Sequence, residues 1–157
     1  MENGSDELNG QPDSHYTYQR WLPAVQNDWA VRADWCVADS YAKANHHPVA
    51  AVKGEAVRTV KPGQKVVLDA SPSKDPDKNA LSYSWWQYHE ADSAAAKLTI
   101  ENNTSKDKAS FVVPDEPGKQ LHVILEVKDN GSPVLTSYQR VIFNIRTAAN
   151  SGAPKQD

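Results

Sequence analysis

The stretch Val66–Tyr88 constrains the fold of this chain most strongly, because it reads as two short strands joined by a loop that cannot be buried. Its sequence is VVLDASPSKDPDKNALSYSWWQY. The apolar residues at each end alternate with polar ones, which is typical of half-buried strands. The Ser, Pro, Asp, Asn and Lys residues between them are typical of an exposed loop. If the alternating residues through Trp85 face the core, Trp86 and Tyr88 face outward.

The rest of the chain after Pro48 repeats this pattern of short alternating runs and turn signals. Turns are marked by Pro62-Gly63 and by Asp129-Asn130-Gly131, among others. Many short strands with no helices between them are typical of an antiparallel sandwich. The predicted fold is therefore mainly β, an immunoglobulin-like antiparallel β-sandwich preceded by one α-helix. The run from Val66, with LDAS, then DPD, then LSYSW, is similar to PKD and cadherin-like sandwich modules. The expected strands cover residues 49–52, 56–60, 65–70, 81–89, 97–101, 108–113, 120–128 and 137–146.

The segment from Pro23 to about Lys43 predicts that helix, because it lacks Gly and its apolar residues recur at helical spacing. Pro48 is expected to prevent its continuation. The helix has two apolar stripes, and a helix at the edge of a globule needs only one. Two stripes therefore indicate a helix that lies between two bodies. One stripe is Leu22, Val25, Trp29, Ala33 and Cys36, and the second, nearly opposite, is Val31, Trp35, Ala38 and Ala42.

Composition sets the domain organisation and excludes some partners. The polar ends, residues 1–17 and 148–157, are predicted to be disordered tails. Residues 18–45 are predicted to form the helical segment and residues 46–147 the sandwich.

The 17 Lys and Arg against 20 Asp and Glu give a net charge of −3 with no long block of one sign. Neither nucleic acid nor a membrane is therefore an expected partner. The chain shows no leader and no membrane span, and we expect it to be a fragment of a larger protein.

Alternation also predicts which side chains share the outer face of one sheet. The strands at 120–128 and 137–146 are expected to lie beside the strand that carries Trp85. An apolar patch with a polar rim on such a face usually marks an interaction. The outward residues are Trp86, Tyr88, His122, Ile124, Glu126, Arg140 and Ile142.

Several segments resemble a known protein family. They are AVQNDWAVRADWCV, HHPVAAV, LDASPSKDPDKNALSYSWWQYHEA, ASFVVPDEPGKQLHVILEVKDNGSPVL and YQRVIFNI. Together they resemble the C-terminal part of the cellulose-binding, nucleoside-hydrolase-like family of polysaccharide-degrading bacteria, from about Tyr18 to Ile145. The resemblance implies a preceding hydrolase-like domain, with QNDWAVRADWC similar to its closing helix. It also implies a secreted, periplasmic or cell-surface location.

The outer face admits two interpretations. In the first, aromatic rings stack on the C–H face of a sugar while polar side chains bind its hydroxyls, so the face binds a cellulose-like polysaccharide. The candidates are Trp86, Tyr88, His122, Glu126 and Arg140. In the second, the chain is a structural module that packs against the hydrolase-like domain, and the helix or that domain covers the face. The candidates for such packing are Trp21, Trp29, Trp35, Ile124 and Ile142.

A metal site and catalysis have weaker support. Asp75, Asp77 and Asn79 are a weak calcium candidate, because alternating oxygen ligands begin calcium loops. The EF-hand positions that need Gly and Glu hold Ala80 and Trp86, so a turn that caps its own backbone is the alternative. No other cofactor is expected. The chain shows no G-x-S-x-G or H-E-x-x-H motif, and we expect it not to be an enzyme. Any N-glycosyl or glycoside hydrolase activity is expected only in the preceding domain.

Overall fold

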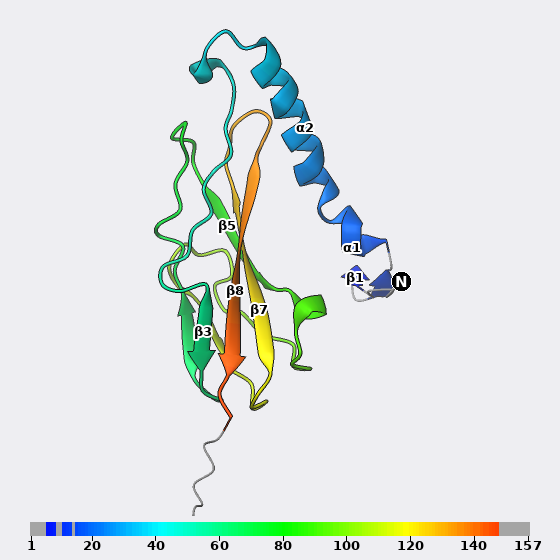
Figure 1. The fold of residues 1–157 in the computed structure, drawn as a ribbon, viewed down its shortest axis with the longest axis vertical. Helices are drawn as coiled ribbons and strands as arrows, with labels where there is room; N and C mark the ends of the chain where they lie inside the picture. The colour runs from blue at the N-terminus through cyan, green and yellow to red at the C-terminus, as the bar shows by residue number, and fades with distance from the viewer. Residues whose placement is uncertain (1–5, 9–10, 14, 148–157) are drawn as a thin grey trace, which may run out of the picture.

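The alternating segments form two sheets that face each other, with a helix lying beside them (Figure 1). The computed structural model describes residues 6–8, 11–13 and 15–147. The larger sheet has the order β3-β8-β7-β5, and the smaller sheet pairs β4 with β6. The strands are β3 (Val57–Val60), β4 (Lys65–Leu68), β5 (Ser82–Gln87), β6 (Ala109–Val112), β7 (Gln120–Lys128) and β8 (Thr136–Ile145). The pairs are antiparallel except β3 with β8, which is parallel.

Two expected strands, 49–52 and 97–101, are each reduced to a single bridge. In the first, the hydroxyl of Ser73 donates to the carbonyl of Ala51 and accepts from its N–H, both at 3.0 Å. In the second, the side-chain oxygen of Gln87 accepts from the N–H of Leu98 at 2.6 Å. Side chains thus satisfy backbone groups that a ladder would otherwise use, and the strand predictions were wrong there for this reason.

Trp85 lies at the centre of the core between the sheets. It is 1% exposed, and its indole N–H donates to the carbonyl of Ser105 at 3.0 Å. Phe111 and Phe143 meet edge to face across the two sheets at 5.2 Å. The inward residues expected from alternation are buried, which confirms the sandwich core. The other buried members are Val60, Val66, Leu68, Ala70, Ala94, Ala109, Val113, Leu121, Val123, Leu125, Val127, Val141 and Ile145.

The predicted helix is α2 (Leu22–Val37), which follows a short turn of helix, α1 (Tyr16–Gln19). It ends six residues before the expected Lys43, and the chain then makes the 3-10 turn η1 (Tyr41–Lys43). The cause is His46, whose ring stacks on Tyr41 at 3.5 Å and on Trp35 at 5.7 Å. Because both aromatic residues contact one imidazole, the chain has to reverse between them.

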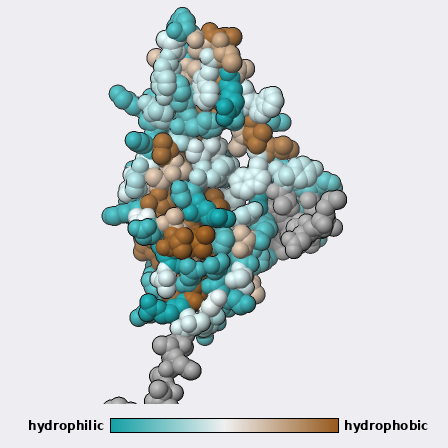
Figure 2. Space-filling view, viewed as in Figure 1, coloured by the Kyte–Doolittle hydropathy of each residue, from teal (hydrophilic) through white to brown (hydrophobic). Residues whose placement is uncertain are grey.

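The stripe of α2 that carries Val31 and Trp35 faces the sandwich, and we call it the inner stripe. The stripe that carries Trp29 is the outer stripe. Val31 is fully buried, and the indole N–H of Trp35 donates to the carbonyl of Asn45 at 2.8 Å. His47 bonds the carboxylate of Asp28 at 2.8 Å, which holds the middle of the helix. The outer stripe faces away from both sheets, and Figure 2 shows apolar surface where α2 ends at the top of the molecule. The exposed residues of this stripe are Leu22, Val25, Trp29, Ala33 and Cys36.

The described part of the segment 1–17 is ordered. β1 (Asp6–Leu8) and β2 (Gln11–Asp13) form an antiparallel pair. The carboxylate of Asp13 then accepts from the N–H groups of His15 and Tyr16, where α1 begins. Asp13 thus satisfies amides that a helix start leaves free, in a segment for which a disordered tail was predicted. Residues 148–157 lie outside the described part.

Asn45 joins the helical segment to the sandwich. Its side-chain N–H groups donate to the carboxylate of Asp129 and to the carbonyl of Pro133, and its oxygen accepts from Asn79, each at 2.8 Å. A Cβ at Gly131 would lie 2.1 Å from the Asn45 nitrogen. This turn position therefore admits only glycine while Asn45 keeps its bonds.

Candidate functional site

The outer face of the larger sheet collects the residues that alternation predicted. Trp86 lies opposite Ile124, which lies opposite Arg140. His122 lies opposite Ile142 in the same sheet. Because residues directly opposite each other in an antiparallel pair point to the same side, these side chains share one face. The shared face is confirmed, whereas the function of each residue on it stays a prediction.

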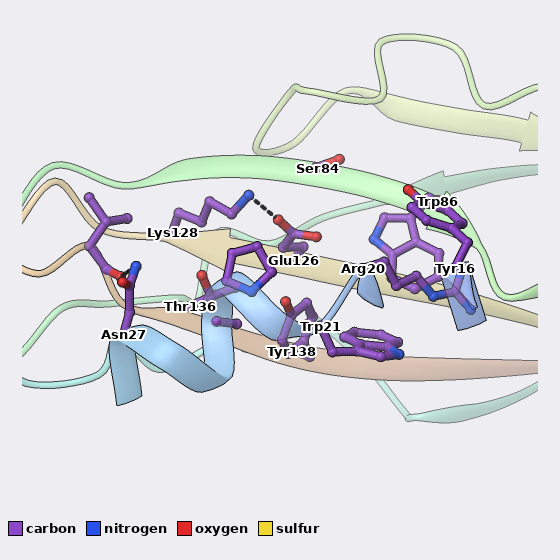
Figure 3. A pocket seen from close by; sticks show the side chains of 13 residues that line it. Tyr16, Arg20, Trp21, Asn27, Ser84, Trp86, Glu126, Lys128, Thr136 and Tyr138 are labelled. Carbon is purple, nitrogen blue, oxygen red and sulfur yellow. Dashed lines mark hydrogen bonds and ion pairs between the residues drawn. The ribbon is translucent and has the colours of Figure 1, made fainter. Parts of the chain in front are cut away.

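A groove of about 600 Å³ opens between this face and the start of the helix (Figure 3). Strands β5, β7 and β8 supply its floor, and α1 and α2 supply one wall. We call it the helix–sheet groove. Its lining is Tyr16, Arg20, Trp21, Pro23, Ala24, Asn27, Ser84, Trp86, Glu126, Lys128, Val134, Thr136 and Tyr138.

One end of the helix–sheet groove is aromatic (Figure 3). Trp21 lies 5.6 Å from Trp86 at 47° and 5.0 Å from Tyr138 at 83°. The guanidinium of Arg20 lies over the rings of Trp86 and Tyr88 at 5.1 Å and 5.3 Å, a cation–π arrangement. Trp86 and Tyr88 therefore do not form an open platform, as the second interpretation of this face expects. Residues just before α2 cover part of it and turn it into an aromatic corner.

The other part of the groove is polar. The carboxylate of Glu126 pairs with the ammonium of Lys128 at 2.5 Å, and the side chain of Asn27 donates to the carbonyl of Val134 at 2.7 Å. Burial raises the pKa of Tyr138 to about 12, and the charge of Glu126 adds to this. The phenol therefore keeps its proton at neutral pH and can donate a hydrogen bond. The hydroxyls of Ser84 and Thr136 add further donors and acceptors.

His122 lies on the same face but does not line the groove. It is 7% exposed, and neither ring nitrogen has a hydrogen-bond partner among the described residues. Burial lowers the pKa of His122; the charge of Asp92 opposes this shift and that of Arg140 adds to it. The carboxylate of Asp92 accepts from the backbone N–H of His122 at 2.5 Å and from the side chain of Gln87 at 2.6 Å. Burial raises the pKa of Asp92, and these two hydrogen bonds offset only part of that rise.

The groove divides the residues predicted from the sequence. Of the carbohydrate candidates, Trp86 and Glu126 line it, whereas His122 and Arg140 do not. Tyr88 does not line the groove but contacts one residue that does, since its ring meets Trp86 edge to face at 6.0 Å. The packing candidates also separate. Trp21 lines the groove, Trp35 holds the end of α2, Trp29 is 75% exposed, Ile124 is buried and Ile142 is half-buried.

Three groove residues were not among the predicted site residues. The sequence carried a signal for one of them and none for the other two. Tyr138 stands on the same outward alternation as Arg140 and could have been included on that ground. Arg20 and Asn27 had no such signal, because they reach the groove only through the position of α2 on the sheet. That position depends on contacts between residues far apart in the chain, such as Arg20 with Glu90 at 2.8 Å.

The calcium candidate is a turn with internal hydrogen bonds. One carboxylate oxygen of Asp75 accepts from the N–H groups of Asp77 and Asn79, both at 2.9 Å. The carboxylate of Asp77 accepts from the backbone N–H of His46 at 2.7 Å. The second oxygen of Asp75 is buried without a partner among the described residues, but one oxygen does not make a site. In the described part of the chain, no three His, Cys, Asp or Glu side chains converge to hold a metal ion.

The fold and the groove define a class of protein. The chain is an immunoglobulin-like β-sandwich module that carries a mixed aromatic and polar groove on its larger sheet. Within the described ranges, no helix is long and apolar enough to cross a membrane. Residues 65–145, more than half of the chain, match the family model described as the cellulose-binding protein Sde0182, C-terminal domain. The chain belongs to this family, which confirms the resemblance seen in its sequence segments.

One solved structure agrees with this assignment. A nucleoside hydrolase-related hypothetical protein from Saccharophagus degradans, associated with carbohydrate metabolism, is 41% identical with a TM-score of 0.78. The match covers 82% of this chain and 32% of that one, so this chain spans about a third of its length. The PKD domain from the KIAA 1837 protein is 22% identical with a TM-score of 0.44, over 66% of this chain and 95% of that domain. No curated protein matches the chain.

Proposed function

We propose that the chain is a non-catalytic carbohydrate-binding module whose helix–sheet groove binds a cellulose-like polysaccharide. One observation carries the proposal, namely that a single groove combines aromatic rings with carboxylate, amide and hydroxyl groups. Sugar rings offer apolar C–H faces and polar edges, and this combination complements both. The description of the family as cellulose-binding supports the same substrate class. Such a substrate places the module outside the cytoplasm, either secreted, periplasmic or at the cell surface.

Each part of the groove has a role in this proposal. Trp86 and Trp21 offer the apolar corner against which a sugar ring packs. The protonated hydroxyl of Tyr138 donates to a sugar oxygen, and the carboxylate of Glu126 accepts from a sugar hydroxyl. Asn27 contributes an amide from the wall opposite the sheet. The bound sugar thus lies between α2 and the strands.

The groove does not have the arrangement of a glycosidase. Glycoside hydrolysis ordinarily needs two carboxylates on either side of the scissile bond. Among the described residues that line the groove, Glu126 is the one carboxylate, and it is paired with Lys128. We therefore expect binding without release of reducing sugars.

A titration of soluble cello-oligosaccharides followed by tryptophan fluorescence tests the proposal. The variant Trp86→Ala is expected to lose binding, and Glu126→Gln, which preserves shape, is expected to weaken it. The control is Trp29→Ala, which removes a tryptophan from the exposed outer stripe and leaves the groove intact. Circular dichroism establishes that each variant is folded. Wild-type affinity in Trp86→Ala, or no affinity of the wild type for any glucan, would contradict the proposal.

A second candidate function is packing against a nucleoside-hydrolase-like domain. The outer stripe of α2 favours it, because it exposes Leu22, Val25 and Trp29 along one side of a helix whose other side is partly buried against the sandwich. A contiguous exposed apolar surface of this kind usually marks an interface. The solved relative is nucleoside hydrolase-related and has about two-thirds of its chain outside the match.

Alkylation of Cys36 tests this second candidate. Cys36 lies on the outer stripe and is a free, exposed thiol. It is expected to react slowly in a protein that carries both the hydrolase-like domain and this module, and quickly in the present chain. Equal rates in the two proteins would exclude the outer stripe as the interface. A cysteine introduced at Val67, which is exposed on the opposite sheet, gives the matched control.

A further inference from the structure

We infer that the helix–sheet groove binds a single glucan chain, dissolved or in amorphous cellulose, and not the flat face of crystalline cellulose. This inference rests on the proposed function and specifies the physical form of its substrate. It follows from the relative orientation of the aromatic rings, from the wall beside them and from the placement of the polar groups.

The aromatic rings cannot lie together on a flat surface. A crystalline face presents parallel sugar rings in one plane, so it stacks only on aromatic rings that share a plane. Here Trp86 is tilted by 47° from Trp21 and by 84° from Tyr88, and Trp21 is tilted by 83° from Tyr138. No two of these neighbouring rings are coplanar, and Arg20 lies against Trp86 and Tyr88. The corner fits one sugar ring and excludes an extended plane.

The groove wall excludes a rigid surface. Trp21 and Asn27 stand on the helical side of the groove, and Trp86 and Tyr138 stand half-buried on the sheet side (Figure 3). A crystal face cannot reach the floor without removing α2, whereas a single chain can enter between the two sides. The volume of about 600 Å³ lies within the roughly 300–1,000 Å³ typical of sites for small ligands.

The polar groups are placed to contact the edges of a sugar chain. The hydroxyls of a β-linked glucan project from the edges of its rings, and in a crystal neighbouring chains bond many of them. The groove offers polar groups from both sides, with Asn27 on α2 and Glu126, Thr136 and Tyr138 on the sheet. Such groups can bind only a chain whose edges are free. A site for a crystal face would gain nothing from them.

Three probes test the inference on the whole chain: cellohexaose in solution, acid-swollen amorphous cellulose and microcrystalline cellulose. We expect cellohexaose to bind, to change the tryptophan fluorescence and to displace the protein from amorphous cellulose. Retention on microcrystalline cellulose is expected to be no greater than that of a non-binding protein. Tyr138→Phe keeps the ring and removes the hydroxyl, so cellohexaose affinity should fall about fivefold to tenfold, as expected for one lost hydrogen bond. Trp29→Ala should bind as the wild type does.

The outcomes separate the inference from the proposed function. Retention on microcrystalline cellulose that cellohexaose does not displace would overturn the inference and leave carbohydrate binding standing. Unchanged cellohexaose affinity in Tyr138→Phe would also overturn it, because binding would then not depend on a group that contacts the edge of the chain. Failure to bind all three probes would overturn the proposed function itself.

Discussion

At the residue scale, the buried imidazole of His122 links stability to pH. Burial lowers its pKa in the folded state, so the unfolded chain takes up the proton first as the pH falls. The contribution of His122 to the free energy of unfolding therefore falls as the pH drops below about 6.5. Asp92 acts in the opposite sense, because burial raises its pKa and its contribution is lost as the pH rises from about 3.8 through the folded value.

The variant His122→Phe isolates the first effect, since it keeps an aromatic ring and removes the titrating group. The free energy of unfolding of His122→Phe is expected to fall less than that of the wild type between pH 7 and pH 5. Urea unfolding at pH 7, 6 and 5 measures this difference. Asp92, Arg140 and His89 are present in both proteins, so the difference reports the titration of His122 together with its coupling to Asp92. Equal dependence on pH in the two proteins would show that His122 does not titrate differently on folding.

At the element scale, the two faces of α2 have opposite energetic roles. Trp35 packs on His46 and donates to Asn45, whereas Trp29 points into solvent. We expect Trp35→Ala to lower the free energy of unfolding by about 2–3 kcal/mol, because it removes packing and a hydrogen bond. Trp29→Ala is expected to change it by less than about 0.5 kcal/mol, as is usual for surface residues. Urea unfolding measures both values.

Hydrogen exchange locates the same effect in the structure. In Trp35→Ala, the amides near the end of α2 should exchange faster while those of β7 and β8 stay protected. Uniform loss of protection across the chain would instead mean that α2 and the sandwich unfold as one unit. Slow exchange throughout α2 in this variant would contradict the assigned role of Trp35.

The helix α2 also shows which structural features a local sequence pattern can predict and which it cannot. Helical spacing correctly placed Val31 and Trp35 opposite Trp29, because the geometry of a helix is local. The end of the helix was predicted six residues too late. The chain reverses there because Tyr41 and Trp35 stack on His46, a contact that no local pattern encodes. The two lost strands have the same explanation, since Ser73 and Gln87 replace ladder bonds with side-chain bonds.

At the scale of the whole molecule, the groove needs both the sandwich and the helix. All buried members of the core cluster lie at Val60 or later, so we expect a chain that begins at residue 44 to fold. It should bind cellohexaose at least tenfold more weakly, because Arg20, Trp21 and Asn27 are absent from it. Thermal unfolding and fluorescence titration measure the two properties. Full affinity in the shortened chain would show that the helical wall takes no part in binding.

The candidate site was therefore only half predictable from the sequence. Alternation along the strands placed Trp86 and Glu126 on the correct face, because that pattern repeats every two residues and is local. The sequence offered the helix as a possible cover of this face and Trp21 as a packing residue. It did not predict where the helical wall lies, because that depends on how Trp21 packs on Trp86 and Tyr138 across more than 60 residues of chain. The region that matches the family model begins at residue 65 and does not include that wall.

The attachment of α2 at both ends has a mechanical consequence. Trp21 anchors its beginning on the sheet, His47 holds its middle, and Trp35 anchors its end. Between its two ends the helix acts as a rigid support, and its distance from the strands sets the width of the groove. A domain bound to the outer stripe of α2 would therefore be able to move the helical wall of the groove toward or away from the sheet. Binding of a domain at the outer stripe and binding of the sugar in the groove would then be mechanically coupled through α2.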